Sequence, residues 1–162
     1  MQFYSTNRKT SPVSLREAVV RGLATDRGLF MPEVIRRFPP AFYQNMKEMT
    51  LREISFVVAE AFFGENVEAG KLKEIVDETL NFDIPLVQVA DNRYSLELFH
   101  GPTLAFKDVG ARFMARLLAY FNKQEGERQV NVLVATSGDT GSAVANGFLD
   151  VSGVKVFVLY PQ

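Results

Sequence analysis

One lysine of the chain follows a Gly-Pro-Thr turn, a setting in which an amine could react with a carbonyl compound. Residues 101–107 (GPTLAFK) lie between an alternating segment and a helical pattern, which places Lys107 in the first helical turn. The positive end of that helix, together with partial burial beside Leu104 and Phe106, favours the neutral amine that Schiff-base chemistry requires. Because most lysines are solvated surface residues, these neighbours alone leave a surface lysine and a reactive lysine both open.

A glycine-rich loop lies further along the chain, between a predicted strand and a predicted helix. Residues 135–143 (ATSGDTGSA) combine hydroxyl groups with glycines that let backbone amides approach a ligand, at the positive start of a helix. Such a loop suits phosphate or carboxylate. It matches neither the Walker P-loop nor the dinucleotide fingerprint, and an ordinary turn with Ser or Thr capping the helix explains it equally well.

Taken together, the lysine and the loop predict a candidate cofactor site. In an open parallel sheet, ligands bind at the carboxyl ends of the strands, where both features fall. Pyridoxal phosphate would suit this pair, because it needs an amine for its aldehyde and polar groups that anchor it.

The composition limits the other kinds of site. The 18 Lys and Arg residues nearly balance 19 Asp and Glu residues, so a net charge of −1 gives no field to attract nucleic acid or an anionic membrane. Cysteine is absent and His100 is the single histidine, which excludes disulfides, thiolate chemistry and His-rich metal sites within the chain. We therefore expect no metal, no nucleic acid and no membrane partner. The sequence has neither a signal-peptide core nor an apolar run of bilayer length, so we expect a soluble, cytoplasmic protein.

The elements that would position these residues fall into two regions. Residues 1–83 are predicted to be mostly helical, since Ser14–Glu17 and Thr50–Glu53 both fit a capping box at the start of a helix. The predicted helices start near residue 15, run from about 51 to 63 and cover about 67–80.

Residues 84–162 change character and predict an α/β fold. The segment 94–99 alternates like a strand, and 130–135 is largely apolar and β-branched, as in strands buried on both faces. A further strand is predicted at 154–160, with helices at about 107–122 and 142–149. This order predicts the start of a parallel α/β sheet, which three strands leave incomplete.

Two strings, LELFHGPTLAFKDVGARFMA at 96–115 and VLVATSGDTGSA at 132–143, closely resemble the threonine synthase family. Residues 4–6 (YST) and 22–32 (GLATDRGLFMP) are similar to the N-terminal signature of the same family. The resemblance runs across essentially the whole chain, and HGPTLAFKD is its most specific part. It implies a pyridoxal-phosphate enzyme with the tryptophan-synthase-β-like fold.

The resemblance also implies a role for each residue of the candidate site. Lys107 would carry pyridoxal phosphate through a Schiff base and would act as acid and base on the substrate carbons. Asp139 would face the hydroxyl group of the cofactor. The residues implied to bind the α-carboxylate of the substrate are Ser137, Gly138, Thr140 and Gly141. The implied reaction is the lyase step of threonine biosynthesis that converts O-phospho-L-homoserine and water to L-threonine and phosphate.

In that family, the loop for the cofactor phosphate and the residue facing the pyridine nitrogen lie downstream of these motifs. The resemblance therefore identifies the chain as an N-terminal fragment, which we expect to be inactive alone. A dehydratase on the same fold is disfavoured by the string HGPTLAFKD. The alternative from a different class is a non-catalytic module that binds an anion and self-associates, and the open edge of strand 154–160 predicts self-association in either case.

Two further residues near the candidate site carry weaker hypotheses. His100 could contact the substrate, although a structural hydrogen-bonding role is favoured for a lone histidine at a strand end. Arg112 could bind the substrate phosphate as a fork of donors. An ion pair with Asp108, one helical turn earlier, is the interpretation that we favour for Arg112.

Overall fold

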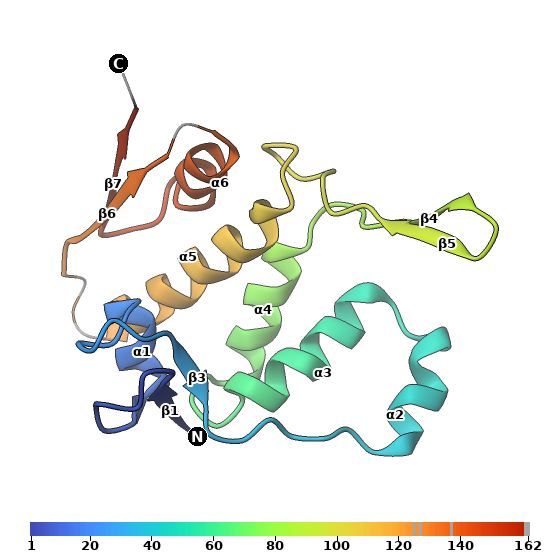
Figure 1. Cartoon of the computed structure of the whole chain (residues 1–162), viewed down its shortest axis with the longest axis horizontal. Coiled ribbons are helices and arrows are strands. Elements are labelled where there is room, and N and C mark those ends of the chain that lie inside the picture. The colour runs from blue at the N-terminus through green and yellow to red at the C-terminus, as the bar shows by residue number, and fades with distance from the viewer. Residues whose placement is uncertain (125, 127, 137, 161–162) are drawn as a thin grey trace. The chain divides into compact units, whose positions relative to one another are not determined.

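The chain folds into two compact units, Met1–Asp77 and Glu78–Gln162 (Figure 1). The computed structural model describes residues 1–124, 126, 128–136 and 138–160. The α/β fold class is confirmed, with helices predominating in the first unit and a parallel strand pair in the second. The predicted division into 1–83 and 84–162 stays a prediction.

The first unit contains a small antiparallel sheet that the sequence analysis did not predict. Its central strand, β1 (Gln2–Ser5), pairs with β2 (Val13–Ser14) on one side and with β3 (Phe30–Pro32) on the other. Strands of two to four residues are too short for an alternating pattern to stand out in the sequence.

Two helices of the first unit start where the capping residues predict. Thr50 Oγ1 accepts a hydrogen bond from Glu53 N (3.3 Å), and the Glu53 carboxylate accepts one from Thr50 N (2.7 Å), which completes a capping box. Ser14 Oγ accepts from Glu17 N (3.2 Å), but the Glu17 carboxylate pairs with Arg21 instead of reaching back. The helices are α1 (Leu15–Arg21), α2 (Pro40–Asn45), the 3-10 helix η1 (Met46–Glu48), α3 (Leu51–Phe63) and α4 (Ala69–Thr79), of which α4 crosses the boundary between the units.

In the second unit, the predicted strand at 94–99 does not belong to the parallel sheet, so this part of the prediction is wrong. The segment forms β5 (Arg93–Leu96), which pairs antiparallel with β4 (Leu86–Ala90) in a separate hairpin. The hairpin turns at Asn92, which has a φ of 57°. Asparagine tolerates this left-handed conformation better than most residues.

The parallel pair consists of β6 (Val130–Ala135) and β7 (Val154–Leu159), joined by α6 (Asp139–Gly147). The long helix α5 (Lys107–Gln124) precedes β6 and packs against α6. Gly147 lies so close to α5 that a Cβ atom there would be 3.0 Å from the carbonyl carbon of Ala111. The absence of a side chain at Gly147 therefore sets the approach of α6 to α5.

Within the described residues, only one face of the parallel pair is covered, so the predicted burial of β6 on both faces is wrong. Along both strands the exposed residues alternate with half-buried or buried ones. On the covered face, Gly141 of α6 approaches Val158 of β7. The register places exposed Leu133 beside exposed Phe157 on the open face.

A carboxylate ties together the loops of the first unit. Asp26 accepts hydrogen bonds from Ser5 Oγ (2.6 Å), Lys9 N (2.9 Å) and Gly28 N (3.0 Å). The hydrogen bond from Ser5, followed by those from the backbone of Gly28 and Lys9, lowers the pKa of Asp26, although desolvation partly opposes the shift. A side chain at Gly28 would overlap Ser5 Oγ.

We expect Asp26→Asn to lower the free energy of unfolding at neutral pH, because the amide offers one acceptor oxygen where the carboxylate offers two. A carboxyl group whose pKa is lowered on folding stabilises the folded state above its unfolded pKa of about 3.9. This contribution is lost as the pH falls through the folded-state pKa. The difference between wild type and variant in urea unfolding should therefore shrink on acidification. Asp83→Asn, at an exposed position, is the control. A difference between wild type and Asp26→Asn that stayed constant with pH would contradict this account.

A second pair of variants tests the approach of α6 to α5. Gly147→Ala should lower the free energy of unfolding by about 1–3 kcal/mol, the range typical of overpacking, because its Cβ would press on backbone atoms of Ala111. Gly110→Ala is the matched control, since a Cβ there meets nothing within 4 Å. That control should raise stability by up to about 1 kcal/mol through helix propensity. Equal effects of the two substitutions in urea unfolding would show that the helices are not in close contact at Gly147.

Candidate functional site

Lys107 is the first residue of α5, as the sequence predicts, and it is half-buried. Its Nζ atom lies 4.6 Å from the centroid of the Phe106 ring, at the distance of a cation–π contact. Leu104 and Phe106 are both exposed, so these two residues do not bury the lysine as expected. Within the described residues no ion pair involves Lys107, which leaves its amine accessible to a ligand.

The turn before Lys107 is held by a buried carboxylate that the sequence analysis did not assign to the site. Asp108 is fully buried and accepts hydrogen bonds from Thr103 N (2.9 Å) and Thr103 Oγ1 (2.6 Å). Gly101 lies against it, since a Cβ there would be 2.5 Å from Asp108 Oδ2. In the sequence, the signal for this contact is an acidic residue that lies directly after Lys107 and five residues after Thr103.

The glycine-rich loop leads into α6, which begins at Asp139, three residues earlier than predicted. Gly138 is the N-cap residue, and among the described residues, which exclude Ser137, no side chain caps the helix. Gly138, Asp139 and Thr140 are exposed. The first N–H groups of a helix lack intrahelical acceptors and carry partial positive charge, which suits an anion.

Two residues of the predicted carboxylate site differ from the rest. Gly141 is buried, its N–H donates to Gly138 O (3.0 Å), and a Cβ there would be 3.0 Å from Thr136 Cγ2. A packing role therefore accounts for Gly141 in this structure. Ser137 lies outside the described residues. The assigned roles of Lys107 and the loop residues in ligand binding stay predictions.

Lys107 and the loop belong to the same unit and lie at the starts of two helices that pack together. Within the described residues, no hydrogen bond or ion pair joins the lysine to Gly138, Asp139 or Thr140. The two parts of the predicted site are thus positioned by the contact between α5 and α6.

His100 has the structural role that the sequence analysis favours. Its Nε2 atom lies 2.7 Å from Glu97 Oε2, and its ring stacks on Phe99 with 4.9 Å between the centroids. The histidine is exposed at the surface of the turn that leads to the lysine. These two contacts account for His100 without a ligand.

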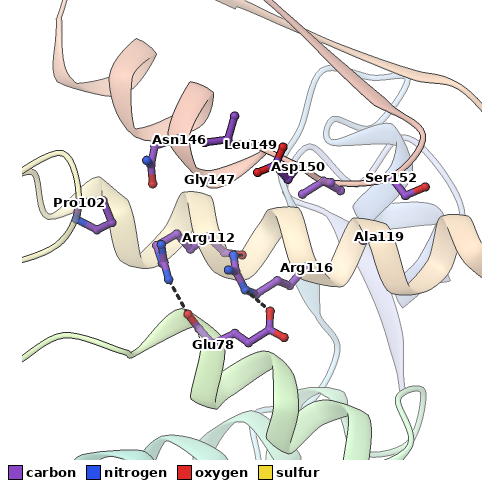
Figure 2. A pocket seen from close by; sticks show the side chains of 11 residues that line it. Glu78, Pro102, Arg112, Arg116, Ala119, Asn146, Gly147, Leu149, Asp150 and Ser152 are labelled. Carbon is purple, nitrogen blue, oxygen red and sulfur yellow. Dashed lines mark hydrogen bonds and ion pairs between the residues drawn. The ribbon is translucent and has the colours of Figure 1, made fainter.

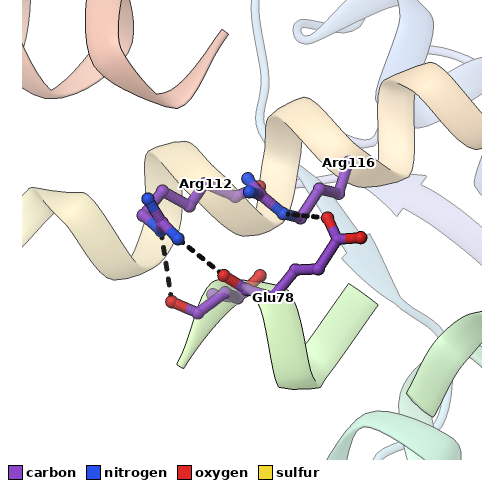
Figure 3. Close-up of polar contacts among 4 residues, drawn as sticks. Glu78, Arg112 and Arg116 are labelled. Atoms are coloured by element: carbon purple, nitrogen blue, oxygen red, sulfur yellow. Dashed lines mark hydrogen bonds and ion pairs between the residues drawn. The ribbon is translucent and has the colours of Figure 1, made fainter. Parts of the chain in front are cut away.

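Arg112 is buried and supports the end of α4, as Figure 3 shows. Its Nε and Nη2 atoms donate to Thr79 O (3.3 Å) and Glu78 O (2.6 Å), while Arg116 Nε donates to Glu78 Oε2 (2.8 Å). The predicted ion pair with Asp108 is wrong, because that carboxylate binds Thr103. Burial and the nearby charge of Arg116 lower the pKa of Arg112, and the carboxylates of Asp108 and Glu78 partly offset this.

A cleft of about 450 Å³ opens beside these arginines (Figure 2). Arg112 and Arg116 of α5 line it together with Asn146 and the segment after α6. Neither Lys107 nor any described residue of the glycine-rich loop lines this cleft. Within the described residues, no helix is long and apolar enough to span a bilayer, and no three His, Cys, Asp or Glu side chains gather as a metal site requires.

Comparison with known proteins finds similarity to threonine synthases. The family described as threonine synthase N terminus matches residues 2–80. Threonine synthase of Serratia marcescens is 41% identical over 162 residues, which cover 100% of this chain and 37% of the relative. The corresponding protein of Saccharomyces cerevisiae is 38% identical over 180 residues, covering 99% of this chain and 35% of the relative.

Two solved structures are similar along the whole chain. Threonine synthase from Escherichia coli superimposes with a TM-score of 0.89 at 39% identity, over 100% of this chain and 37% of that one. The pyridoxal-phosphate-bound threonine synthase from Brucella melitensis gives a TM-score of 0.93 at 35% identity, over 100% of this chain and 36% of that one. The chain thus spans little more than a third of the length of the relatives it matches. By sequence and by fold, the chain is similar to the N-terminal part of threonine synthases.

Proposed function

We propose that the chain is the N-terminal part of a threonine synthase that binds pyridoxal phosphate covalently at Lys107. The reaction would convert O-phospho-L-homoserine and water to L-threonine and phosphate. The observation that carries the proposal is the position of Lys107, an amine without an ion pair among the described residues, at the start of α5 in the string HGPTLAFKD. A relative with a TM-score of 0.93 is a pyridoxal-phosphate-bound threonine synthase, which supports the cofactor.

The donor set of the second unit fits this cofactor and an amino-acid substrate. An accessible amine is available for the aldehyde, and the exposed start of α6 offers backbone N–H groups and the Thr140 hydroxyl to a carboxylate. In our proposal Gly138, Thr140, Gly141 and Ser137, the last outside the described residues, bind the substrate α-carboxylate. Asp139 faces the cofactor hydroxyl.

Lys107 and the loop at the start of α6 would have separate roles in the reaction. The bound cofactor would supply an electron sink for negative charge on the substrate carbons. The Lys107 amine would then remove and return protons at those carbons, with its position fixed by the start of α5. The loop at the start of α6 would hold the carboxylate and so orient the carbon that loses a proton.

Catalysis by these 162 residues alone is not part of the proposal. The chain spans 37% of the length of its Serratia marcescens relative, and we propose that groups binding the cofactor phosphate and pyridine nitrogen come from the remaining length. We also propose a cytoplasmic location and a small-molecule substrate. Neither nucleic acid nor a membrane is proposed as a partner, because the charges of the chain nearly cancel.

The open face of the parallel strand pair favours self-association of this chain. Leu133, Phe157 and Leu159 are 73%, 47% and 60% exposed, and the register places Leu133 beside Phe157. Parallel sheets are normally covered on both faces, and contiguous exposed apolar residues commonly mark an interaction site. We propose that copies of the chain pair through this face, which would also suit the alternative of a non-catalytic module that binds an anion.

The cofactor proposal is tested by adding pyridoxal phosphate, reducing with borohydride and mapping the labelled peptides. We expect a saturable adduct confined to Lys107, because its amine lies at the start of α5 and has no carboxylate partner among the described residues. The other six lysines serve as internal controls. Lys107→Arg should abolish the adduct, whereas Lys123→Arg at the other end of α5 should not. Adducts scattered over many lysines would contradict selective binding by this chain.

Self-association is tested by light scattering over a wide concentration range. Phe157→Lys should shift the mass towards that of a monomer, since a charge on the open face opposes its burial. Val34→Lys is the control, because Val34 is exposed outside any strand or helix. A wild-type chain that stayed monomeric at every concentration would overturn this part of the proposal.

A further inference from the structure

The buried carboxylate beside Lys107 has no part in the function proposed above. Both oxygens of Asp108 are engaged, Oδ1 with Thr103 Oγ1 at 2.6 Å and Oδ2 with Thr103 N at 2.9 Å. A buried carboxylate is costly unless it is paired or hydrogen-bonded. The fold therefore keeps this charge in place by means of the turn that immediately precedes the lysine.

That turn has a conformation that needs external support. Leu104 has a φ of 57°, which is uncommon for a residue with a branched side chain, and its N–H donates to Gly101 O (3.0 Å). Such strained residues persist where the surrounding contacts over-determine them. The two hydrogen bonds from Thr103 to Asp108 bridge the strained residue, because Thr103 directly precedes it and Asp108 follows it in α5.

The turn also carries the group that the lysine contacts. Phe106, whose ring lies beneath Lys107 Nζ at 4.6 Å, is the last residue before α5. Ala105, one residue earlier, is buried and accepts the hydrogen bond from Asp108 N (3.0 Å). A change in the turn would therefore move the ring and the first peptide of the helix together with the lysine backbone.

We propose that Asp108 is a positioning residue for Lys107, which holds Thr103 through two hydrogen bonds and so fixes the direction of the lysine amine. The proposal rests on the function assigned above to Lys107 and extends it to the residue that keeps the amine in place. Asp108 itself would not touch cofactor or substrate, because it is fully buried.

The experiment measures the lysine directly, without cofactor. Trace labelling with acetic anhydride across a pH series gives the reactivity and the pKa of each lysine amine, and Lys123 in the last turn of α5 is the internal reference. Hydrogen exchange at Thr103 N reports the hydrogen bond, and circular dichroism reports the fold. The variants are Asp108→Ala, Thr103→Val and the conservative Thr103→Ser, with Asp83→Ala as an exposed control of matched type.

We expect Asp108→Ala to accelerate exchange at Thr103 N by about tenfold or more, as for loss of a hydrogen bond to a charged group. In the same variant, the ratio of Lys107 reactivity to Lys123 reactivity should become equal to the ratio measured in the chain unfolded by guanidinium. Thr103→Val, which keeps the backbone hydrogen bond, should give an intermediate ratio, and Thr103→Ser should restore that of wild type. Asp83→Ala should change neither readout.

The outcomes separate this inference from the proposed function. A folded Asp108→Ala chain with unchanged Lys107 reactivity would overturn the positioning role, as would a wild-type ratio equal to that of the unfolded chain. If Asp108→Ala failed to fold, Thr103→Val would decide, since an unchanged ratio there also counts against the role. The two proposals can also fail separately. If the reactivity of Lys107 depended on Asp108 but all lysines reacted alike with pyridoxal phosphate, the positioning role would be supported and the cofactor site would be overturned.

Discussion

The close approach of α6 to α5 at Gly147 is the contact on which the second unit depends. With no side chain at Gly147, α6 lies against the backbone of α5 at Ala111, one turn after the lysine. This contact relates the two helix starts that carry the predicted site, since Lys107 begins α5 and Asp139 begins α6. It also directs the covered, valine-rich face of β6 and β7 towards α6, as the contact between Gly141 and Val158 shows.

The sequence predicts best those features whose causes are local. Ser14 and Thr50 cap helices at the predicted residues because a hydroxyl three residues before a glutamate satisfies specific backbone donors. The limits of β6 follow from its largely apolar, valine-rich run. Lys107 begins α5 as predicted, since the Gly-Pro-Thr turn before it cannot continue a helix.

Features that depend on distant partners were not predictable in the same way. An alternating segment indicates a strand but not its partner, so the pairing of β5 with β4 required the structure. The predicted start of α6 lies three residues too late, because the N-cap residue Gly138 has no side chain that would mark it. Asp108 after the lysine is typical of a charge that balances the helix dipole, and only the structure reveals that it binds Thr103.

The parallel pairing of β6 with β7 couples the glycine-rich loop to the sheet. The register joins Val130 to Val154, so the loop and the whole of α6 lie inside the segment that this pairing closes. Closing the segment costs chain entropy, which strand pairing and helix packing must offset. A molecule that binds the loop only in this closed form therefore shifts the equilibrium towards paired strands by mass action. Binding of such a molecule to the loop and pairing of β6 with β7 would thus stabilise each other.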